Sequence, residues 1–180
     1  MEKIKAGGII QNTDLAGIGV MSVPDRPGIA GAVFTALGER DINVEFVVQS
    51  IDLNDRTHII LCVAQDSLEA ALSTIEGVTA EVQAEKVISR PNVAIISVFG
   101  PHFRDRPGVA GVAFSALASV GINILAISTS TSTVACVIDG EHVAQAVEAL
   151  REAFDVPLSA VFSIASWGLS LRSEDCGGGS

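Results

Sequence analysis

The feature that most constrains this chain of 180 residues is a segment that occurs twice. The stretch from Asp25 reads Asp-Arg-Pro-Gly-Ile-Ala-Gly-Ala-Val-Phe-Thr-Ala-Leu, and the stretch from Asp105 reads Asp-Arg-Pro-Gly-Val-Ala-Gly-Val-Ala-Phe-Ser-Ala-Leu. The offset of 80 residues continues to Asn43 and Asn123, and 11 of the 19 residue pairs from Asp25 to Asn43 are identical. A repeat of this kind indicates a duplicated structural unit. We therefore expect two small cores rather than one large one.

Each copy predicts the same order of secondary-structure elements. An apolar strand precedes the Asp-Arg-Pro-Gly loop, and the helix that follows in copy one carries Ile29, Val33 and Leu37 on its apolar face. Two strands joined by a turn come next, and a second helix closes the copy. This order predicts the α+β class, with two ferredoxin-like βαββαβ units, antiparallel sheets and helices on one sheet face. The expected strands are 18–23, 42–49, 57–63 and 80–87 in copy one and 93–99, 122–128 and 133–138 in copy two; the expected second helices are 67–75 and 141–154.

The last strand of copy two has two candidate sources. The N-terminal segment 4–10 precedes copy one and has no other role, and we favour it; the C-terminal segment 158–165 is the alternative. The expected domains are thus 15–90 and 91–157, the second completed by strand 4–10, followed by an extension over 158–180 whose tail from Ser173 is disordered. Near the end of the first helix of each copy, Gly38 or Gly121 is expected to take a left-handed conformation.

The charge balance restricts the partners of the chain. Eleven Lys and Arg residues against 21 Asp and Glu give a net charge of −10, which argues against binding to nucleic acid or to anionic membranes. The stretch 107–138 has no charged residue, but Gly121-Ile-Asn123 and the hydroxyl-rich 128–133 interrupt it, so we do not expect a membrane span. No secretory signal is visible, and we expect a cytoplasmic protein.

The three cysteines have no paired spacing. Cys62 and Cys136 lie inside apolar runs and are expected to be small buried thiols, and Cys176 lies near the C-terminus. Aligning Cys62 with Cys136 gives an offset of 74, which implies that copy two has lost about six residues between its two middle strands.

The Asp-Arg-Pro-Gly loop is the chemical focus of the sequence. The amides of Gly28, Ile29 and Ala30 lie at a helix start, where unpaired donors and the helix dipole receive a carboxylate or a phosphate. Asp25 beside them can accept an ammonium group, and the two receptors together describe a site for a free α-amino acid. The simpler interpretation, favoured on spacing alone, is that Asp25 caps the helix and Gly28 only turns the chain.

The duplicated unit resembles the paired ACT domains at the C-terminal end of aspartate kinase. The resemblance runs roughly from Ile9 to Val156 and rests on the two loops together with Ile42-Asn-Val-Glu45, Val48-Gln-Ser50, Ile127-Ser-Thr-Ser130 and the final helix to Phe154. It implies a non-catalytic regulatory module that binds a free amino acid, lysine or threonine, at interfaces between ACT units. It also implies a homodimer through ACT–ACT contacts and an associated aspartate kinase catalytic chain.

The resemblance also assigns residues to the site. In copy one it implies Asp25, Gly28, Ile29 and Ala30 at the loop and helix start, Gln49 on the second strand, and Glu45 where an aspartate is frequent. From a facing unit it implies Asn123 and Ile124, followed by Ser128, Thr129 and Ser130. Copy two departs from the family, because Asp105 stands where Ser is common and Thr131 where a glutamate is common. Two similar sites per chain therefore become possible, the second with Asp105, Gly108, Val109 and Ala110.

Other functions have less support. His58, His102 and His142 are unrelated in repeat position, and no cysteine or serine pairs with them, so no enzyme, metal or cofactor is expected. Arg26 and Arg106 are expected to be exposed charges that offset nearby acids. A stand-alone amino-acid sensor and a structural protein without ligand remain alternatives to the kinase subunit.

Copy two has also lost charges that copy one keeps. Glu39, Arg40, Asp41 and Glu45 of copy one correspond to Ser119, Val120, Gly121 and Leu125. This loss is typical of a surface buried between ACT units.

Overall fold

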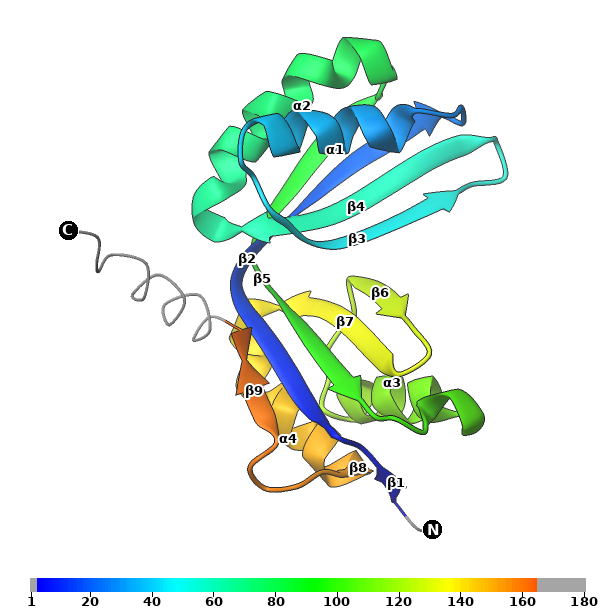
Figure 1. Ribbon diagram of the computed structural model, residues 1–180, viewed down its shortest axis with the longest axis vertical. Helices are drawn as coiled ribbons and strands as arrows, with labels where there is room; N and C mark the ends of the chain where they lie inside the picture. Colours follow the sequence, from blue (N-terminus) through cyan, green and yellow to red (C-terminus); the bar gives the residue numbers. More distant parts are fainter. Residues whose placement is uncertain (1–2, 165–180) are drawn as a thin grey trace, which may run out of the picture. The chain divides into compact units, whose positions relative to one another are not determined.

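A computed structural model describes residues 3–164, which form two compact units (Figure 1). The copy-one unit spans residues 14–93, and the copy-two unit combines the chain before Asp14 with the described chain from Ala94 onward. Two long strands, β2 (Gly8–Pro24) and β5 (Lys86–Phe99), each contribute residues to both units. Cys176 and the expected tail from Ser173 lie outside the described residues.

The copy-one unit has a four-stranded sheet in the order β3-β4-β2-β5. Its remaining elements are α1 (Ile29–Glu39), β3 (Val44–Ile51), β4 (Arg56–Ala64), the 3-10 turn η1 (Gln65–Ser67) and α2 (Leu68–Val82). β4 is antiparallel to both neighbours, with Leu61 opposite Ile18 on β2 and opposite Val47 on β3. β3 is the edge strand, because only β4 pairs with it along the sheet order.

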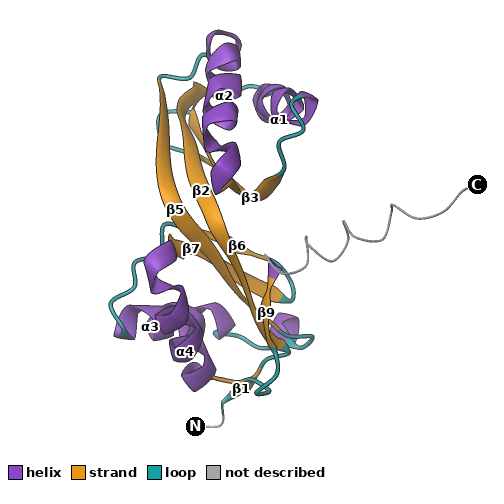
Figure 2. Cartoon of the chain, turned by 90° about the vertical axis from the view of Figure 1, so that its left-hand side faces the viewer, coloured by secondary structure: helices purple, strands orange, loops and turns teal. Residues whose placement is uncertain are grey.

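The core of the copy-one unit lies between this sheet and the two helices (Figure 2). Ile29, Val33 and Leu37 of α1 are all buried, which confirms the helix face expected from their spacing. They pack with alternate residues of the strands and with one face of α2. The expected α+β class with helices on one sheet face is thereby confirmed.

The second half of copy one differs from the sequence-based expectation. The predicted helix 67–75 is present as α2, but it continues to Val82. The predicted strand 80–87 is wrong, because the next strand, β5, begins only at Lys86. The β-branched residues after Gly77 suggested a strand, yet Val82 is fully buried in the core as part of the helix. The hydroxyl of Thr79 donates to the carbonyl of Ile75 at 3.0 Å, a bond that satisfies it inside a helix.

The copy-two unit repeats the same plan with shorter strands. Its sheet order is β9-β2-β5-β7-β6, and its helices bury Val109, Leu117 and Leu150 against the sheet. Its elements are β1 (Ile4–Lys5), η2 (Phe103–Asp105), α3 (Val109–Ser119), β6 (Ala126–Thr129), β7 (Thr133–Asp139), η3 (Gly140–His142), α4 (Val143–Ala153), β8 (Phe154–Asp155) and β9 (Val161–Ser163).

Both candidate segments for the last strand contribute to the copy-two sheet, although Ile4 and Lys5 of the N-terminal segment form β1 and pair instead with β8 in a separate two-stranded sheet. The N-terminal half of β2 holds an inner position, and β9 pairs with it in parallel, with Ile9 opposite Val161. The close approach depends on Gly8, since a Cβ there would lie 2.7 Å from the carbonyl oxygen of Ala160. The C-terminal segment therefore adds a strand outside the N-terminal one rather than replacing it.

The turn after the first helix uses different residues in the two copies. Gly121 has a φ of +76° after α3, as expected. Gly38 lies inside α1, and the left-handed residue of copy one is Asp41, with a φ of +57°. Asp41 is the residue that aligns with Gly121 at the offset of 80. Aspartate tolerates this conformation better than most residues, so the glycine of α1 is not needed for the turn.

Strand pairing changes the alignment of the middle strands. Gln49 lies opposite Ile59 in copy one and Thr129 lies opposite Val134 in copy two. The two residues of a pair are ten positions apart in copy one and five apart in copy two, so copy two has lost five residues rather than six. Cys136 belongs to the helix-covered core, whereas Cys62 alternates with the core residues Leu61 and Val63. A slip of one residue reverses the face of a side chain, so the two cysteines are not equivalent.

The hydrophobic, uncharged stretch 107–138 contains α3, β6 and β7. Within residues 3–164, no helix combines the length and apolar character needed to cross a membrane.

Burial of the two thiols predicts low reactivity. Desolvation raises the pKa of Cys62 to about 12 and that of Cys136 to about 11. Because the thiolate is the reactive species, the native Cys176→Ser variant is expected not to react with an aromatic disulfide reagent at pH 8. In denaturing urea, two thiols per chain are expected to react. Because burial favours the neutral thiols, their contribution to the free energy of unfolding is fully present below the unfolded pKa of about 8.5. It is lost as the pH rises from there through the raised pKa values of the folded protein. Rapid reaction of the native variant would contradict the buried assignment.

Candidate functional site

The copy-one loop, residues 25–28, joins the end of β2 to the start of α1. Gly28 has a φ of +99°, a conformation in which any other residue is strained, and α1 begins directly after it. Among residues 3–164, no side chain forms a capping hydrogen bond at this helix start. The interpretation that Asp25 caps the helix is therefore wrong. The main-chain donors of the first turn at Gly28, Ile29 and Ala30 lack such a side-chain acceptor, as an anion-binding helix start requires.

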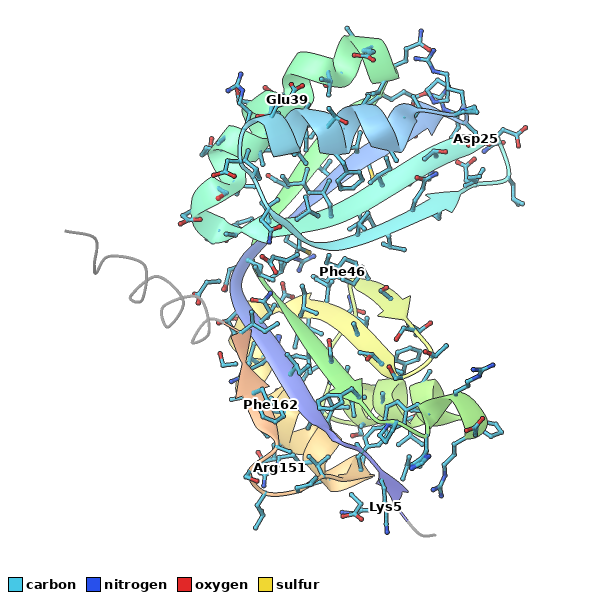
Figure 3. All side chains as sticks on the ribbon, viewed as in Figure 1. Lys5, Asp25, Glu39, Phe46, Arg151 and Phe162 are labelled. Atoms are coloured by element: carbon cyan, nitrogen blue, oxygen red, sulfur yellow. The ribbon has the colours of Figure 1, made fainter. Side chains whose placement is uncertain are left out.

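Asp25 is held by the β3–β4 hairpin instead. The hydroxyl of Thr57 donates to Oδ1 of Asp25 at 3.2 Å, and the amide of Asp25 donates to the carbonyl of Asp55 at 3.3 Å. Thr57 is 1% exposed, whereas Asp25 is exposed at the end of the unit where the hairpin turns (Figure 3). The carboxylate is thus fixed by a buried donor and remains open to a ligand.

A β-bulge lies just before this loop. The pairing of β2 with β4 shifts between Val20 and Val23, and Ser22 has a φ of +56°. The amide of Ser22 donates to Nδ1 of His58 at 3.2 Å, and its carbonyl accepts from the guanidinium of Arg56. Arg56 also forms an ion pair with Glu85.

The hairpin turn is stabilised by Asp52. Its Oδ1 accepts from the amides of Asn54 at 2.8 Å and Arg56 at 3.0 Å, and its Oδ2 lies 3.2 Å from Nε2 of His58. The two main-chain bonds are the chief reason that the pKa of Asp52 is lowered, and His58 adds a smaller effect. The contribution of Asp52 to stability is therefore present at neutral pH and is lost as the pH falls through its lowered pKa. Sequence reasoning missed His58, Asp52 and Arg56, because their roles depend on a bulge that the apolar alternation of β2 does not reveal.

Arg26 has a structural partner that differs from the expected one. Its guanidinium donates to the main-chain carbonyl of Glu81, in the last turn of α2, rather than offsetting an acidic side chain. This bond ties the copy-one loop to α2, whose free carbonyls attract cations. A groove of about 190 Å³ lies beside the bond and is lined by Arg26, Pro27, Gly28, Ile29, Ala32, Glu81 and Val82.

The two expected residues of β3 lie at different ends of that strand. Gln49 is exposed and lies two residues before Ile51, which pairs with Thr57 beside the loop. Glu45 is near the start of β3 and accepts a 2.6 Å hydrogen bond from the side chain of Asn43. At about 3.3 Å per residue, Glu45 and Ile51 are roughly 20 Å apart along the strand. Within one unit, Gln49 therefore lies toward the loop end of β3, and Glu45 lies at the opposite end.

The copy-two loop is built differently. Asp105 is exposed at the end of the turn η2, and Gly108, with a φ of +88°, directly precedes α3. The contact to the hairpin is made by the amide of Gly100, which donates to the carbonyl of Ser132 at 2.9 Å, as Asp25 does to Asp55. Gly100 precedes Gly108 by eight residues, whereas Asp25 precedes Gly28 by three. Copy two has therefore gained five residues before the loop and lost five from the hairpin.

The inserted residues change the surroundings of Asp105. Phe103 is buried and packs against Phe154 with ring centroids 6.1 Å apart. A Cβ at Gly100 would lie 2.7 Å from the Phe103 ring, so glycine is needed there. Among the described residues, no side chain holds the carboxylate of Asp105 as Thr57 holds that of Asp25. The two loops share their sequence but not their anchoring, while Val109 and Ala110 begin α3 as Ile29 and Ala30 begin α1.

The remaining expected residues lie along β6 and its flanks. Asn123 is exposed just before β6, and Ile124 packs against the copy-two core. Thr129 has the pairing position that Gln49 has in copy one. The amide of Ser130 donates to the carbonyl of Thr133 at 2.8 Å and closes a tight turn. Within this turn, the hydroxyl oxygen of Ser130 accepts from the amide of Ser132 at 3.4 Å. Across residues 3–164, no three His, Cys, Asp or Glu side chains converge in a way that would hold a metal ion.

Comparison with known proteins identifies the relatives of this chain. Residues 18–79 and residues 96–154 each match a family model described as ACT domain. An aspartokinase from Thermus thermophilus is 36% identical over 159 residues, which are 87% of this chain and 39% of the relative. The chain thus spans about two fifths of the length of the curated relative it matches.

Two solved structures have the same fold over most of the chain. The ligand-free regulatory subunit of aspartate kinase from Thermus thermophilus is 36% identical with a TM-score of 0.75, and the match covers 83% of this chain and 98% of that one. A structure of aspartokinase alpha and beta subunits is 29% identical with a TM-score of 0.76 and is matched over 99% of its chain.

Replacing Thr57 tests the anchoring of the loop. Thr57→Val keeps the buried volume but removes the donor to Asp25, so the free energy of unfolding is expected to fall by about 1 kcal/mol in urea titrations. Amide exchange at Asp25 is expected to accelerate, because its bond to Asp55 loses a neighbouring restraint. Thr74→Val, which removes a similar buried hydroxyl bonded at 2.7 Å to Ala70, is the control. Unchanged exchange at Asp25 in Thr57→Val would contradict the anchoring role.

Proposed function

Because this chain belongs to the family of aspartate kinase regulatory subunits with two ACT domains, we propose that it binds a free amino acid and thereby regulates an aspartate kinase chain. Its role is regulatory and not catalytic. We place this role in the cytoplasm, where free thiols such as those of Cys62 and Cys136 stay reduced.

The observation that carries the proposal is the pairing of two receptors at the copy-one loop. The first turn of α1 presents main-chain donors without a side-chain cap, and the Asp25 carboxylate is held beside it by Thr57. A helix start attracts a carboxylate, and a fixed carboxylate attracts an ammonium group. The α-carboxylate and α-ammonium of one free amino acid satisfy both receptors at once.

Lysine or threonine is the proposed effector. Gln49 lies on the same side of the unit as the loop and offers both a donor and an acceptor to the effector side chain. Asp55 is a further exposed acid in the adjoining turn, so this end of the unit is rich in negative charge. That charge supports lysine over threonine at the copy-one loop.

A facing ACT unit completes the proposed site. Asn123, exposed before β6, and Ile124 are the proposed contribution of that unit, and Glu45 lies near the equivalent position at the start of β3 in copy one, where it aligns with Leu125. We propose a homodimer through ACT–ACT contacts, which the loss of charge between Ser119 and Leu125 supports. The effector binds the closed arrangement better than the open one and shifts the population toward it.

The copy-two loop is proposed as a weaker second site. Gly108, Val109 and Ala110 repeat the helix start, with Gly108 in the same left-handed conformation as Gly28. However, Asp105 lacks an anchor equivalent to Thr57, and the turn formed by Ser130 replaces the longer hairpin. Ordering an unanchored carboxylate costs conformational entropy on binding, which lowers affinity.

The kinase partner is proposed from the length of the relatives. The matched aspartokinase from Thermus thermophilus is more than twice as long as the matched segment, and one solved relative is described as alpha and beta subunits. We propose that an aspartate kinase catalytic chain associates with this module and responds to its effector.

A thermal-unfolding screen against the twenty amino acids tests the binding proposal. At 100-fold excess over its dissociation constant, lysine or threonine is expected to stabilise the protein by about 2.7 kcal/mol, which raises the midpoint by roughly 5–10 °C. Asp25→Ala is expected to abolish the response, and Asp105→Ala to leave most of it.

Each other outcome of the screen has a defined meaning. Equal loss in both variants would indicate two equivalent sites and contradict the ranking of the loops. A screen in which no amino acid raises the midpoint would contradict the proposed function and favour a structural interaction protein.

A further inference from the structure

We propose that His58 is a positioning residue for the copy-one loop, and that its protonation loosens the loop and weakens effector binding. The link to the effector rests on the proposed function, whereas the positioning role does not. His58 lies on β4, outside the loop, and acts on it through the bulge at Ser22.

The bulge leaves a main-chain group that the sheet ladder does not satisfy. Val20 lies opposite Ile59 and Val23 opposite Thr57, so Met21 and Ser22 together face the single residue His58. An extra residue of this kind drops out of the ladder and bends the strand. The Ser22 amide is satisfied by the His58 ring, and its carbonyl by Arg56. Two side chains of β4 thus hold a non-glycine residue at a φ of +56°.

The bend determines where the loop begins. Asp25 follows Ser22 by three residues, and it makes its amide contact with Asp55 and its carboxylate contact with Thr57 just beyond the bulge. The same imidazole contacts Asp52 in the hairpin turn through its other nitrogen. His58 therefore connects the two segments between which Asp25 is held.

These contacts define one protonation state of the ring. Nδ1 accepts from the Ser22 amide, so the proton of the neutral ring is on Nε2, where it is donated to Asp52. Protonation places a second N–H on Nδ1, directly facing the Ser22 amide. Two donors cannot share that contact, so the charged ring must release Ser22.

The charged groups around the ring determine the size of the effect. Asp52 from the turn favours the imidazolium, but its Oδ1 is already occupied by two amides. Arg56 on β4 opposes a second positive charge nearby, and Glu85 before β5 neutralises Arg56. The residues that face the ring from β2 and β3 are the uncharged Met21, Ser22 and Ser50. Attraction to Asp52 therefore competes with loss of the Ser22 contact.

In the described part of copy two, no histidine has the position of His58. Val134 has the pairing position of Ile59, so the residue equivalent to His58 is Thr133. Threonine has no titration near neutral pH. The pH effect is therefore expected at the copy-one loop alone.

The first test needs no ligand. In ¹⁵N-labelled protein, the Ser22 amide resonance is expected to shift as the pH falls from about 8 to 5.5, the range in which imidazoles titrate. His58→Asn places an amide oxygen near the Nδ1 position as a non-titrating acceptor, and the shift is expected to disappear. His102→Asn, at an exposed histidine of copy two, is the matched control and keeps it. A Ser22 amide that does not titrate, or that titrates equally in His58→Asn, would overturn the proposal.

The second test measures affinity with L-lysine and L-threonine as probes. Neither probe changes charge between pH 5.5 and 8, so a pH dependence reports the protein. The wild-type affinity is expected to fall about tenfold at the lower pH, a coupling of ordinary size. His58→Asn is expected to bind at pH 8 within about threefold of wild type and to lose the dependence; a retained dependence would overturn the proposal. Absence of binding at every pH contradicts the proposed function, and the Ser22 titration then decides the positioning role.

Discussion

The copy-one loop depends on its attachment to the β3–β4 hairpin. Two hydrogen bonds, one from the Asp25 amide to the carbonyl of Asp55 and one from the Thr57 hydroxyl to the Asp25 carboxylate, place that carboxylate beside the start of α1. The hairpin must be long enough to reach the loop, and Asp52 must close its turn in the correct geometry. The bulge at Ser22 supplies the matching bend from the other strand. The anchoring of the Asp25 carboxylate therefore depends on how far the hairpin extends, whereas the helix start after Gly28 recurs after Gly108 beside the shorter hairpin of copy two.

The two copies solve this requirement in opposite ways. Copy one combines a short loop with a long hairpin, and copy two combines a loop longer by five residues with a hairpin shorter by five. In copy two, Phe103 packs against Phe154 and gives the longer loop its own apolar anchor. These opposite changes in length keep a main-chain hydrogen bond between loop and turn in both copies. The carboxylate of Asp105, however, is not held by a buried donor as that of Asp25 is held by Thr57. Identical Asp-Arg-Pro-Gly sequences are thus anchored differently in the two units.

The repeat and its apolar periodicity were sufficient to predict the class of the fold and the face of α1, because these depend on spacing alone. The extension of α2 to Val82 was not predictable in this way, since Val78 and Thr79 favour a strand locally and only burial in the core makes them helical. The alignment of Cys62 with Cys136 failed because residue identity does not record strand register. Asp25 and Gly28 were found from a local motif. His58 and Asp52 were not, because they meet Ser22 only after β4 has paired with a bulged strand.

The sharing of β2 and β5 between the two units has a consequence for how this chain can be divided. Each strand is a single continuous stretch of backbone that belongs to one unit in its first half and to the other in its second half. A cut between residues 90 and 91 would sever β5 inside its ladder. The copy-one unit is the continuous stretch 14–93, whereas a fragment that begins at Ala94 would lack the part of β2 that precedes Asp14 and belongs to the copy-two sheet. The duplication is therefore visible in the sequence as two consecutive modules, but the copy-two unit cannot be excised as one continuous segment of the chain.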